Sequence, residues 1–177
     1  MEKNQRNVSV IKDTKGRSIV MINDIRFKGK RAVNWEDVKE YLKQYVGGVY
    51  KIADSGDIVC VGADFPDEYT GSVYTRGLRE TAAKAKANVS QGIPELIDTA
   101  VGKHFRENRG GKHQWGARYG WYRFNSTFML PVYGEDGMVQ RYNVFHASLL
   151  FRHANDGKMY LYDVLDIKKE TSNPLES

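Results

Sequence analysis

Histidine and arginine residues on one predicted strand are the groups in this sequence best suited to metal-free catalysis. His146 and Arg152 fall on the same face of that strand, and His153 follows directly. Cleavage of RNA by its own 2′-OH needs a base, an acid and a cation near the developing charge, which such side chains can supply. His146 and Arg152 lie ~20 Å apart along an extended strand, so a surface or structural role is the simpler interpretation. The sequence leaves other sets open, among them His104 with His113 and His153 with Arg141 and Thr171.

A basic and aromatic segment, residues 102–123, is the second candidate site. Six lysines and arginines against one glutamate give it a net charge of +5, which equals the net charge of the whole chain. Cations attract phosphates and flat rings stack on bases, so this composition is typical of proteins that bind single-stranded nucleic acid. A charged loop that is merely solvated is the alternative. The residues that we expect to bind nucleic acid or a partner are Lys103, Arg106, Arg109, Lys112, Trp115, Arg118, Trp121 and Arg123.

An acidic stretch, residues 63–72, is expected to form a loop. It contains Asp64, Asp67 and Glu68, and three carboxylates this close together could hold Mg²⁺, which prefers oxygen ligands. No second acidic cluster in the sequence completes such a site, so we expect no bound metal and interpret the stretch as a solvated loop. Its carboxylates could also make an acidic contact with a partner.

Signatures of other enzyme classes are absent from the sequence. It contains no glycine-rich phosphate-binding motif, no cysteine or histidine pair at zinc spacing and no nucleophile elbow, which predicts no cofactor and argues against kinases, dehydrogenases and hydrolases. The single cysteine, Cys60, lies in an apolar run and fits a small buried side chain in a reducing compartment. A polar N-terminus and the lack of an apolar run of ~20 residues predict a cytoplasmic protein without a membrane span.

Three long strands near the C-terminus are expected to carry two of the histidines. Asp-Gly occurs in both separators, at 134–137 and 155–158, and favours a tight reversal because glycine accepts a positive φ. We therefore predict an antiparallel three-stranded meander over residues 121–133, 138–154 and 159–168. Alternate residues of a strand point to opposite sides, so one set of the middle strand should face the core. That set is Phe145, Ala147, Leu149, Phe151 and His153.

The N-terminal part is expected to form two hairpins around a helix. Residues 8–12 and 18–22 flank one turn, residues 49–53 and 58–62 flank another, and Asn34 is a suitable N-cap for the helix between them. A long helix is predicted over residues 72–91, with Lys84 and Lys86 on its surface, and a short one begins at Ile93. The expected fold class is therefore α+β. The expected parts are a ββαββ-like unit at 1–62, a helix pair with the meander at 63–170, and a tail at 171–177.

Several strings of this sequence resemble a protein family found in plasmids, phages and integrative elements of gut bacteria. They are DFPDEY at 64–69, AKAKAN at 83–88, SQGIPELI at 90–97, GWYRF at 120–124, LPVY at 130–133, RYNVF at 141–145, RHANDGKMYLYD at 152–163 and KKET at 168–171. The resemblance covers about residues 58–175. Members of that family occur as small free-standing proteins and as a domain of very large polyvalent proteins.

Two functions are implied by this resemblance. Helices followed by a meander are similar to the barnase, EndoU and RelE-like RNases, which implies a metal-free endoribonuclease that uses His146, Arg152 or His153. Small free-standing members are also similar to anti-CRISPR proteins, including inhibitors of type II-A Cas9. This second likeness implies a counter-defence protein without a catalytic residue, which binds Cas9 or its guide RNA complex in the bacterial cytoplasm and blocks DNA cleavage. Plain binding of DNA or RNA is a third possibility.

Overall fold

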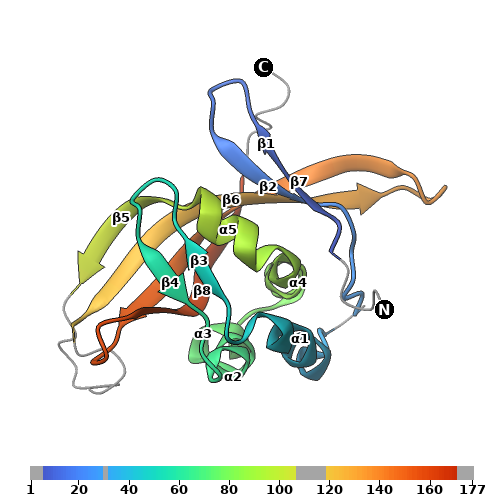
Figure 1. The fold of residues 1–177 in the computed structure, drawn as a ribbon. Coiled ribbons are helices and arrows are strands. Elements are labelled where there is room, and N and C mark those ends of the chain that lie inside the picture. The colour runs from blue at the N-terminus through green and yellow to red at the C-terminus, as the bar shows by residue number, and fades with distance from the viewer. Residues whose placement is uncertain (1–5, 30–31, 107–118, 171–177) are drawn as a thin grey trace.

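The computed structural model describes residues 6–29, 32–106 and 119–170, which form a mainly β fold (Figure 1). The strands are β1 (Val8–Lys12), β2 (Ser18–Ile22), β3 (Val49–Lys51), β4 (Ile58–Cys60), β5 (Val101–Arg106), β6 (Trp121–Tyr133), β7 (Val139–His153) and β8 (Met159–Lys169). The helices are α1 (Trp35–Leu42), α2 (Phe65–Gly71), α3 (Val73–Arg76), α4 (Glu80–Val89) and α5 (Ile93–Thr99), with 3₁₀ turns η1 (Lys43–Tyr45) and η2 (Ser90–Gly92). None of the described helices is long and apolar enough to cross a membrane.

The strands of the described residues join one curled sheet in the order β1-β2-β6-β7-β8-β4-β3, with β5 also paired to β6. The prediction of an α+β fold with a separate three-stranded meander is therefore wrong. The three long strands do form and pair antiparallel, but they are the centre of an eight-stranded sheet. The two N-terminal hairpins extend it on opposite sides, through parallel pairing of β2 with β6 and of β4 with β8. Parallel pairing of segments far apart in the sequence leaves no local signal, so the sequence did not indicate it.

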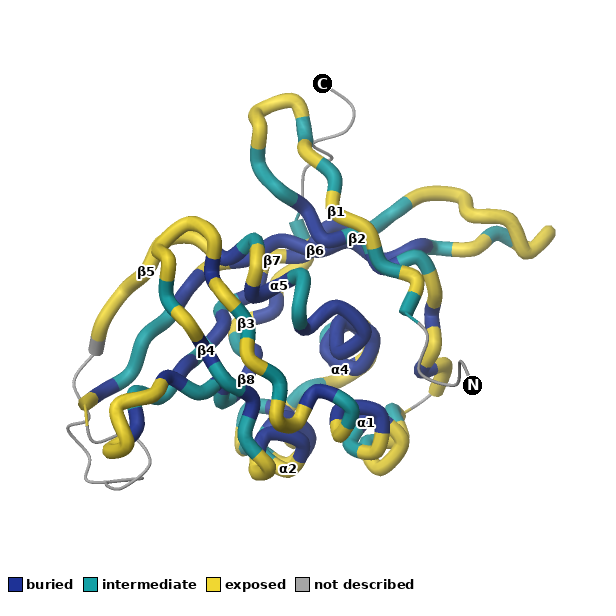
Figure 2. The backbone as a smooth tube through the Cα atoms, viewed as in Figure 1, coloured by how far each residue is buried: buried dark blue, intermediate teal, exposed yellow. Residues whose placement is uncertain are grey.

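Strand β6 is long enough for two neighbours to share one of its edges. Strand β5 pairs with its first part, between Trp121 and Asn125, and β2 pairs with Phe128 and Met129. The hairpin of β6 and β7 continues as an arm, and the hairpin of β1 and β2 projects separately from the body (Figure 1). Exposed residues lie at the ends of these projections, along β5 and on the outer faces of the helices, whereas buried residues lie where strands and helices meet (Figure 2).

Helices α4 and α5 lie inside the curve of the sheet and supply much of the core (Figure 1). Strand β7 turns the predicted set toward them, and Phe145 and Phe151 are buried. Phe128 of β6 stacks on Phe145 with ring centroids 5.1 Å apart. Four of the five predicted core residues of β7 are thus buried, because every second side chain of a strand points to the same side. The fifth, His153, lies at the end of the strand and is only partly buried.

The helical region differs from its prediction in two places. Residues 63–72, expected as a loop, contain α2, which has Pro66 in its first turn, where a missing N–H does no harm. The long helix expected over residues 72–91 is divided into α3 and α4. Ser72 caps α3, and Glu80 takes a φ of 46° where α4 begins. Lys86, expected on the surface, is completely buried.

An extended segment, residues 23–28, crosses α4 without pairing to a strand. The side chain of Asn88 takes the place of a strand neighbour, since its Oδ1 accepts from the Phe27 N–H at 3.0 Å and its Nδ2 donates to the Phe27 carbonyl at 3.1 Å. Gln91 Nε2 donates to the carbonyl of Asp24 at 2.9 Å. Buried backbone groups need partners, and two side-chain amides supply them here.

Candidate nucleic-acid interface

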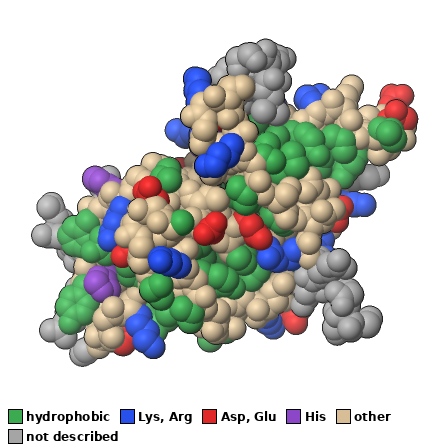
Figure 3. All heavy atoms as spheres, turned by 45° about the horizontal axis from the view of Figure 1, so that its top comes forward, with side chains coloured by type: hydrophobic (Ala, Val, Ile, Leu, Met, Phe, Trp, Pro, Cys, Tyr) green, Lys and Arg blue, Asp and Glu red, His purple; other side chains and the backbone are tan. Residues whose placement is uncertain are grey.

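The end of β5, the start of β6 and the end of β7 meet at one tip of the sheet, where hydrophobic, histidine and basic side chains gather (Figure 3). Lys103 Nζ lies 4.7 Å from the centroid of the Tyr122 ring, and the Phe105 ring lies 5.1 Å from the same ring. The His153 ring lies 5.9 Å from Tyr122 and 5.3 Å from Tyr119. We call these five residues the tip cluster.

The tip cluster is open to solvent on one side and held by the protein on the other. Phe105 is 48% exposed and Tyr119 is 49% exposed, while Tyr122 packs against the main core. Lys103 Nζ lies 2.9 Å from Asp57 Oδ2, which orients its side chain. The sequence did not single out Phe105 and Tyr122 as binding residues, because only the pairing of β5 with β6 brings them together.

The opposite face of the tip carries a second aromatic and basic group. The Arg152 guanidinium lies 4.5 Å from the centroid of the Tyr160 ring and 3.3 Å from Asp64 Oδ2. Trp121, which is opposite Arg152 in the strand register, packs edge-on against Tyr162 with ring centroids 5.0 Å apart. Arg152 is thus stacked and paired within the protein, which makes this face less suited to phosphate than the tip cluster.

Part of the predicted basic segment falls in the described residues. Lys103 belongs to the tip cluster and Trp121 lies on the opposite face. Arg123 NH1 lies 2.8 Å from Asp166 Oδ2, and Arg106 is the last residue of β5. The other predicted binding residues lie outside the described residues: Arg109, Lys112, Trp115 and Arg118.

The three acidic residues predicted as a contact site all interact with the rest of the protein. Asp64 has the arginine partner described above, and Asp67 Oδ1 lies 2.7 Å from Lys39 Nζ. Burial and a hydrogen bond to the Glu68 carboxylate raise the pKa of Tyr162. Within residues 6–29, 32–106 and 119–170, no group of histidine, cysteine, aspartate and glutamate residues is arranged to hold a metal ion.

A second polar cluster surrounds His146 on the other face of β7 from the core. His146 Nε2 lies 2.7 Å from Glu170 Oε1, and Arg17 NH1 lies 3.0 Å from the same oxygen. Asp13 Oδ2 lies 2.9 Å from Arg17 Nε. Lys168 is the cross-strand neighbour of His146, so the two side chains lie side by side. The His146 side chain is 48% exposed, and this His146 cluster therefore presents a carboxylate-backed imidazole to solvent beside cations.

The three residues predicted as an RNase set are not brought together. Arg152 is engaged at the tip, and His153 Nε2 lies 3.2 Å from the Gly157 carbonyl oxygen in the turn between β7 and β8. Glu170 and Arg17, which do surround His146, were not predicted as site residues. They come from positions far apart in the chain, and no spacing in the sequence relates them.

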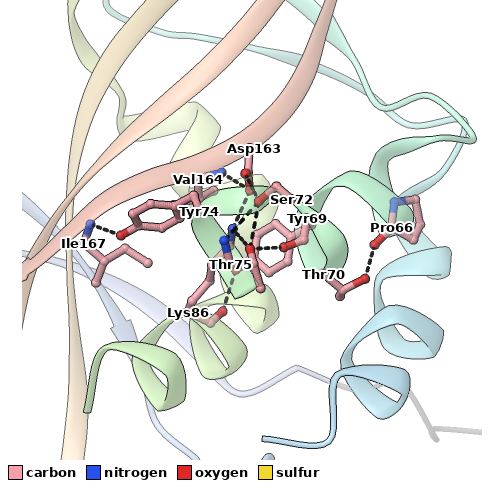
Figure 4. A network of polar contacts seen from close by, with 10 residues as sticks. All are labelled: Pro66, Tyr69, Thr70, Ser72, Tyr74, Thr75, Lys86, Asp163, Val164 and Ile167. Atoms are coloured by element: carbon pink, nitrogen blue, oxygen red, sulfur yellow. Dashed lines mark hydrogen bonds and ion pairs between the residues drawn. The ribbon is translucent and has the colours of Figure 1, made fainter. Parts of the chain in front are cut away.

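A third polar cluster is buried between α2, α3, α4 and β8 (Figure 4). Lys86 Nζ lies 2.5 Å from Asp163 Oδ1 and donates to Thr75 Oγ1. Ser72 Oγ donates to Asp163 Oδ2 at 2.8 Å, and the Tyr69 hydroxyl donates to the Lys86 carbonyl. Burial lowers the pKa of Lys86 and raises the pKa of Asp163, while their mutual attraction opposes both shifts. The Lys86 and Asp163 side chains are 0% and 1% exposed, so this cluster serves the fold rather than a substrate.

Two of the three clusters can therefore meet a ligand. The tip cluster offers flat rings and a cation, and the His146 cluster offers a proton acceptor or donor beside cations. Comparison with models of protein families gives no match for this chain, and no curated protein matches it.

Proposed function

We propose that the protein is a non-enzymatic counter-defence protein that binds a Cas9–guide RNA complex and blocks DNA cleavage, with the tip cluster as its contact with nucleic acid. The observation that carries this proposal is the close grouping of Lys103, Tyr122 and Phe105 at the end of β5 and the start of β6, with the Phe105 ring tilted against the Tyr122 ring and the Lys103 ammonium near it. The resemblance of the sequence to small mobile-element proteins supplies the biological setting.

The tip cluster suits the chemistry of an unpaired strand. Aromatic rings stack on any base, each such contact contributes about 1–3 kcal/mol, and neighbouring cations attract the phosphates. The sequence between Arg106 and Tyr119 contains three further lysine or arginine residues against one glutamate, and this excess of positive charge favours a phosphate backbone. Binding of this kind blocks a nuclease without any catalytic group.

Cleavage of target DNA by Cas9 and a guide RNA tests the proposal. The protein is incubated with the complex in EDTA, excess Mg²⁺ is then added, and DNA and guide are run on the same gel. We expect blocked cleavage with an intact guide. Phe105→Ser should weaken inhibition. Val101→Ser is the matched control: Val101 lies on the same strand and is 47% exposed, against 48% for Phe105, but it is outside the tip cluster, so inhibition should not change. Normal cleavage at saturating wild-type protein would contradict the proposal.

A metal-free endoribonuclease is the second candidate, and the His146 cluster is the observation that favours it. The Glu170 carboxylate, 2.7 Å from the imidazole, orients the ring. Lys168 lies opposite His146 in the register and can stabilise negative charge on a phosphorane. An exposed imidazole beside a cation provides two of the functions that attack by a 2′-OH requires.

Incubation of single-stranded RNA with the protein in EDTA tests this second activity. A metal-free RNase of this kind leaves cyclic 2′,3′-phosphate ends, and His146→Ala and Glu170→Gln should each abolish their formation. His104→Ala, which alters an exposed histidine of β5, is the matched control and should leave the rate unchanged. Intact RNA, or cleavage that survives His146→Ala, would exclude the His146 cluster as a catalytic site.

A further inference from the structure

A cavity of about 570 Å³ opens toward the arm, beyond the part of β6 and β7 that forms the tip. It lies between the extended segment 23–28, the first half of α4, and the strands where the arm begins. Its volume falls in the range of pockets for small organic ligands. The floor is apolar and consists mainly of Ile25, Ala85, Leu130, Pro131 and Phe145.

Two lysines stand on one side of this cavity. Lys28 of the extended segment and Lys84 of α4 both line it, together with Thr81. The same three residues line a neighbouring hollow of about 530 Å³, so the lysines stand where two open spaces meet. Within the described parts of the chain, neither ammonium group forms an ion pair. Two such positive charges favour an anionic group between them.

The other side of the cavity offers groups of a different kind. Tyr133 is 43% exposed on the rim, and burial together with the nearby Asp24 carboxylate raises its pKa. Asn143 lines the cavity from β7 and contributes an amide that can both donate and accept hydrogen bonds. A ring, an amide and a carboxylate match the flat face and the polar edge of a nucleobase.

The geometry points to a binding site for a nucleoside monophosphate in this cavity. The phosphate lies between Lys28 and Lys84, the base covers the apolar floor beside Tyr133, and Asn143 and Asp24 meet the polar edge of the base. An acidic peptide would use the lysines, but its other carboxylates would face repulsion from Asp24. The nucleotide is either free or the end of a strand. This site does not depend on the tip cluster or on inhibition of a nuclease.

Calorimetric titration of the full chain with AMP, GMP, CMP and UMP tests the site. We expect saturable binding of at least one of the four. Lys28→Ala/Lys84→Ala should weaken that binding by about tenfold or more, because a hydrogen bond to a charged group is typically worth at least that factor. Lys12→Ala/Lys51→Ala, which alters two exposed lysines elsewhere, is the matched control and should leave it unchanged. Asn143→Leu should change the order of preference among the bases.

Short oligonucleotides distinguish the two sources of the nucleotide. A 5′-phosphorylated trinucleotide binds more tightly than the mononucleotide if the site takes a strand end, and more weakly if it takes a free nucleotide. Phe105→Ser should leave mononucleotide binding unchanged in either case, which separates this result from the tip cluster. The absence of saturable binding at millimolar nucleotide would overturn the proposal. So would wild-type affinity in Lys28→Ala/Lys84→Ala, or an acidic peptide that binds where no nucleotide does.

Discussion

The ammonium nitrogen of Lys86 lies 2.5 Å from a carboxylate oxygen of Asp163, and the two side chains are 0% and 1% exposed. The pair joins α4 to β8, and the Ser72 hydroxyl extends it to the start of α3. Two charges removed from water are costly, and their attraction and hydrogen bonds offset that cost only while both partners are present. Loss of one member of the pair should therefore destabilise the fold more than loss of both members.

Replacement of Lys86 alone should destabilise the protein strongly. Lys86→Met leaves Asp163 buried without a cation, and we expect the free energy of unfolding to fall by about 3–5 kcal/mol in urea denaturation. Lys84→Met alters an exposed lysine of the same helix and should change it by less than about 0.5 kcal/mol. Lys86→Met/Asp163→Leu should recover most of the loss, because it removes both charges. A double variant no more stable than Lys86→Met would show that packing, not charge, explains the loss.

Asn88→Ala should release the extended segment from α4. The Asn88 amide is bonded to both backbone polar groups of Phe27, and alanine leaves them buried without partners. We expect a loss of about 2–4 kcal/mol in unfolding free energy and faster hydrogen exchange at the Phe27 amide. Asn125→Ala, which alters an exposed asparagine of β6, should affect neither quantity. Unchanged exchange at Phe27 would mean that the segment is held by its apolar contacts alone.

The long strands could be predicted because their side chains alternate and Asp-Gly marks their reversals. The predicted strand at 121–133 coincides with β6, and four of the five residues in the predicted core set of β7 are buried, the exception being His153. The parallel pairs between Val20 and Phe128 and between Val59 and Met159 could not be predicted, since each joins a short N-terminal strand to a long strand in a distant part of the chain. These two pairs join the hairpins to the long strands in one sheet, and because the prediction lacked them, it gave the wrong fold class.

The candidate sites could be predicted less well than the strands. His146 was identified by its chemistry, but its partner Glu170 follows β8 and Arg17 precedes β2, so no local pattern connects them. Lys86 was expected on the surface because lysine is rarely buried without a partner. Its partner Asp163 lies between apolar and aromatic residues of β8, and a carboxylate in such a setting is a sequence signal that a buried cation could be near.

Acid should weaken the His146 cluster through Asp13. Hydrogen bonds from the Arg17 and Lys15 backbone hold the pKa of Asp13 below its ordinary value. A pKa lowered by folding means that the carboxylate stabilises the fold above the unfolded-state value, and that this stabilisation is lost as pH falls through the folded-state value. Asp13→Asn should therefore lower the Tm at neutral pH, and its difference from wild type should shrink as the pH falls below the ordinary pKa of aspartate. A difference in Tm that does not depend on pH would contradict this account. Asp54→Asn alters an exposed aspartate and is the control, with the same Tm as wild type.

Lys103 and Phe105 should both contribute to binding of single-stranded RNA, and the salt dependence of the affinity should distinguish their contributions. Lys103→Gln removes one phosphate contact, so a plot of log affinity against log salt should become shallower by about 0.7 for single strands. Phe105→Ser removes a stacking surface and should weaken binding by about 1–3 kcal/mol with little change in slope. Fluorescence anisotropy with labelled single-stranded RNA at several KCl concentrations measures both effects, with Val101→Ser as control. Parallel plots for wild type and Lys103→Gln would mean that Lys103 stays paired with Asp57, 2.9 Å away, when the strand binds.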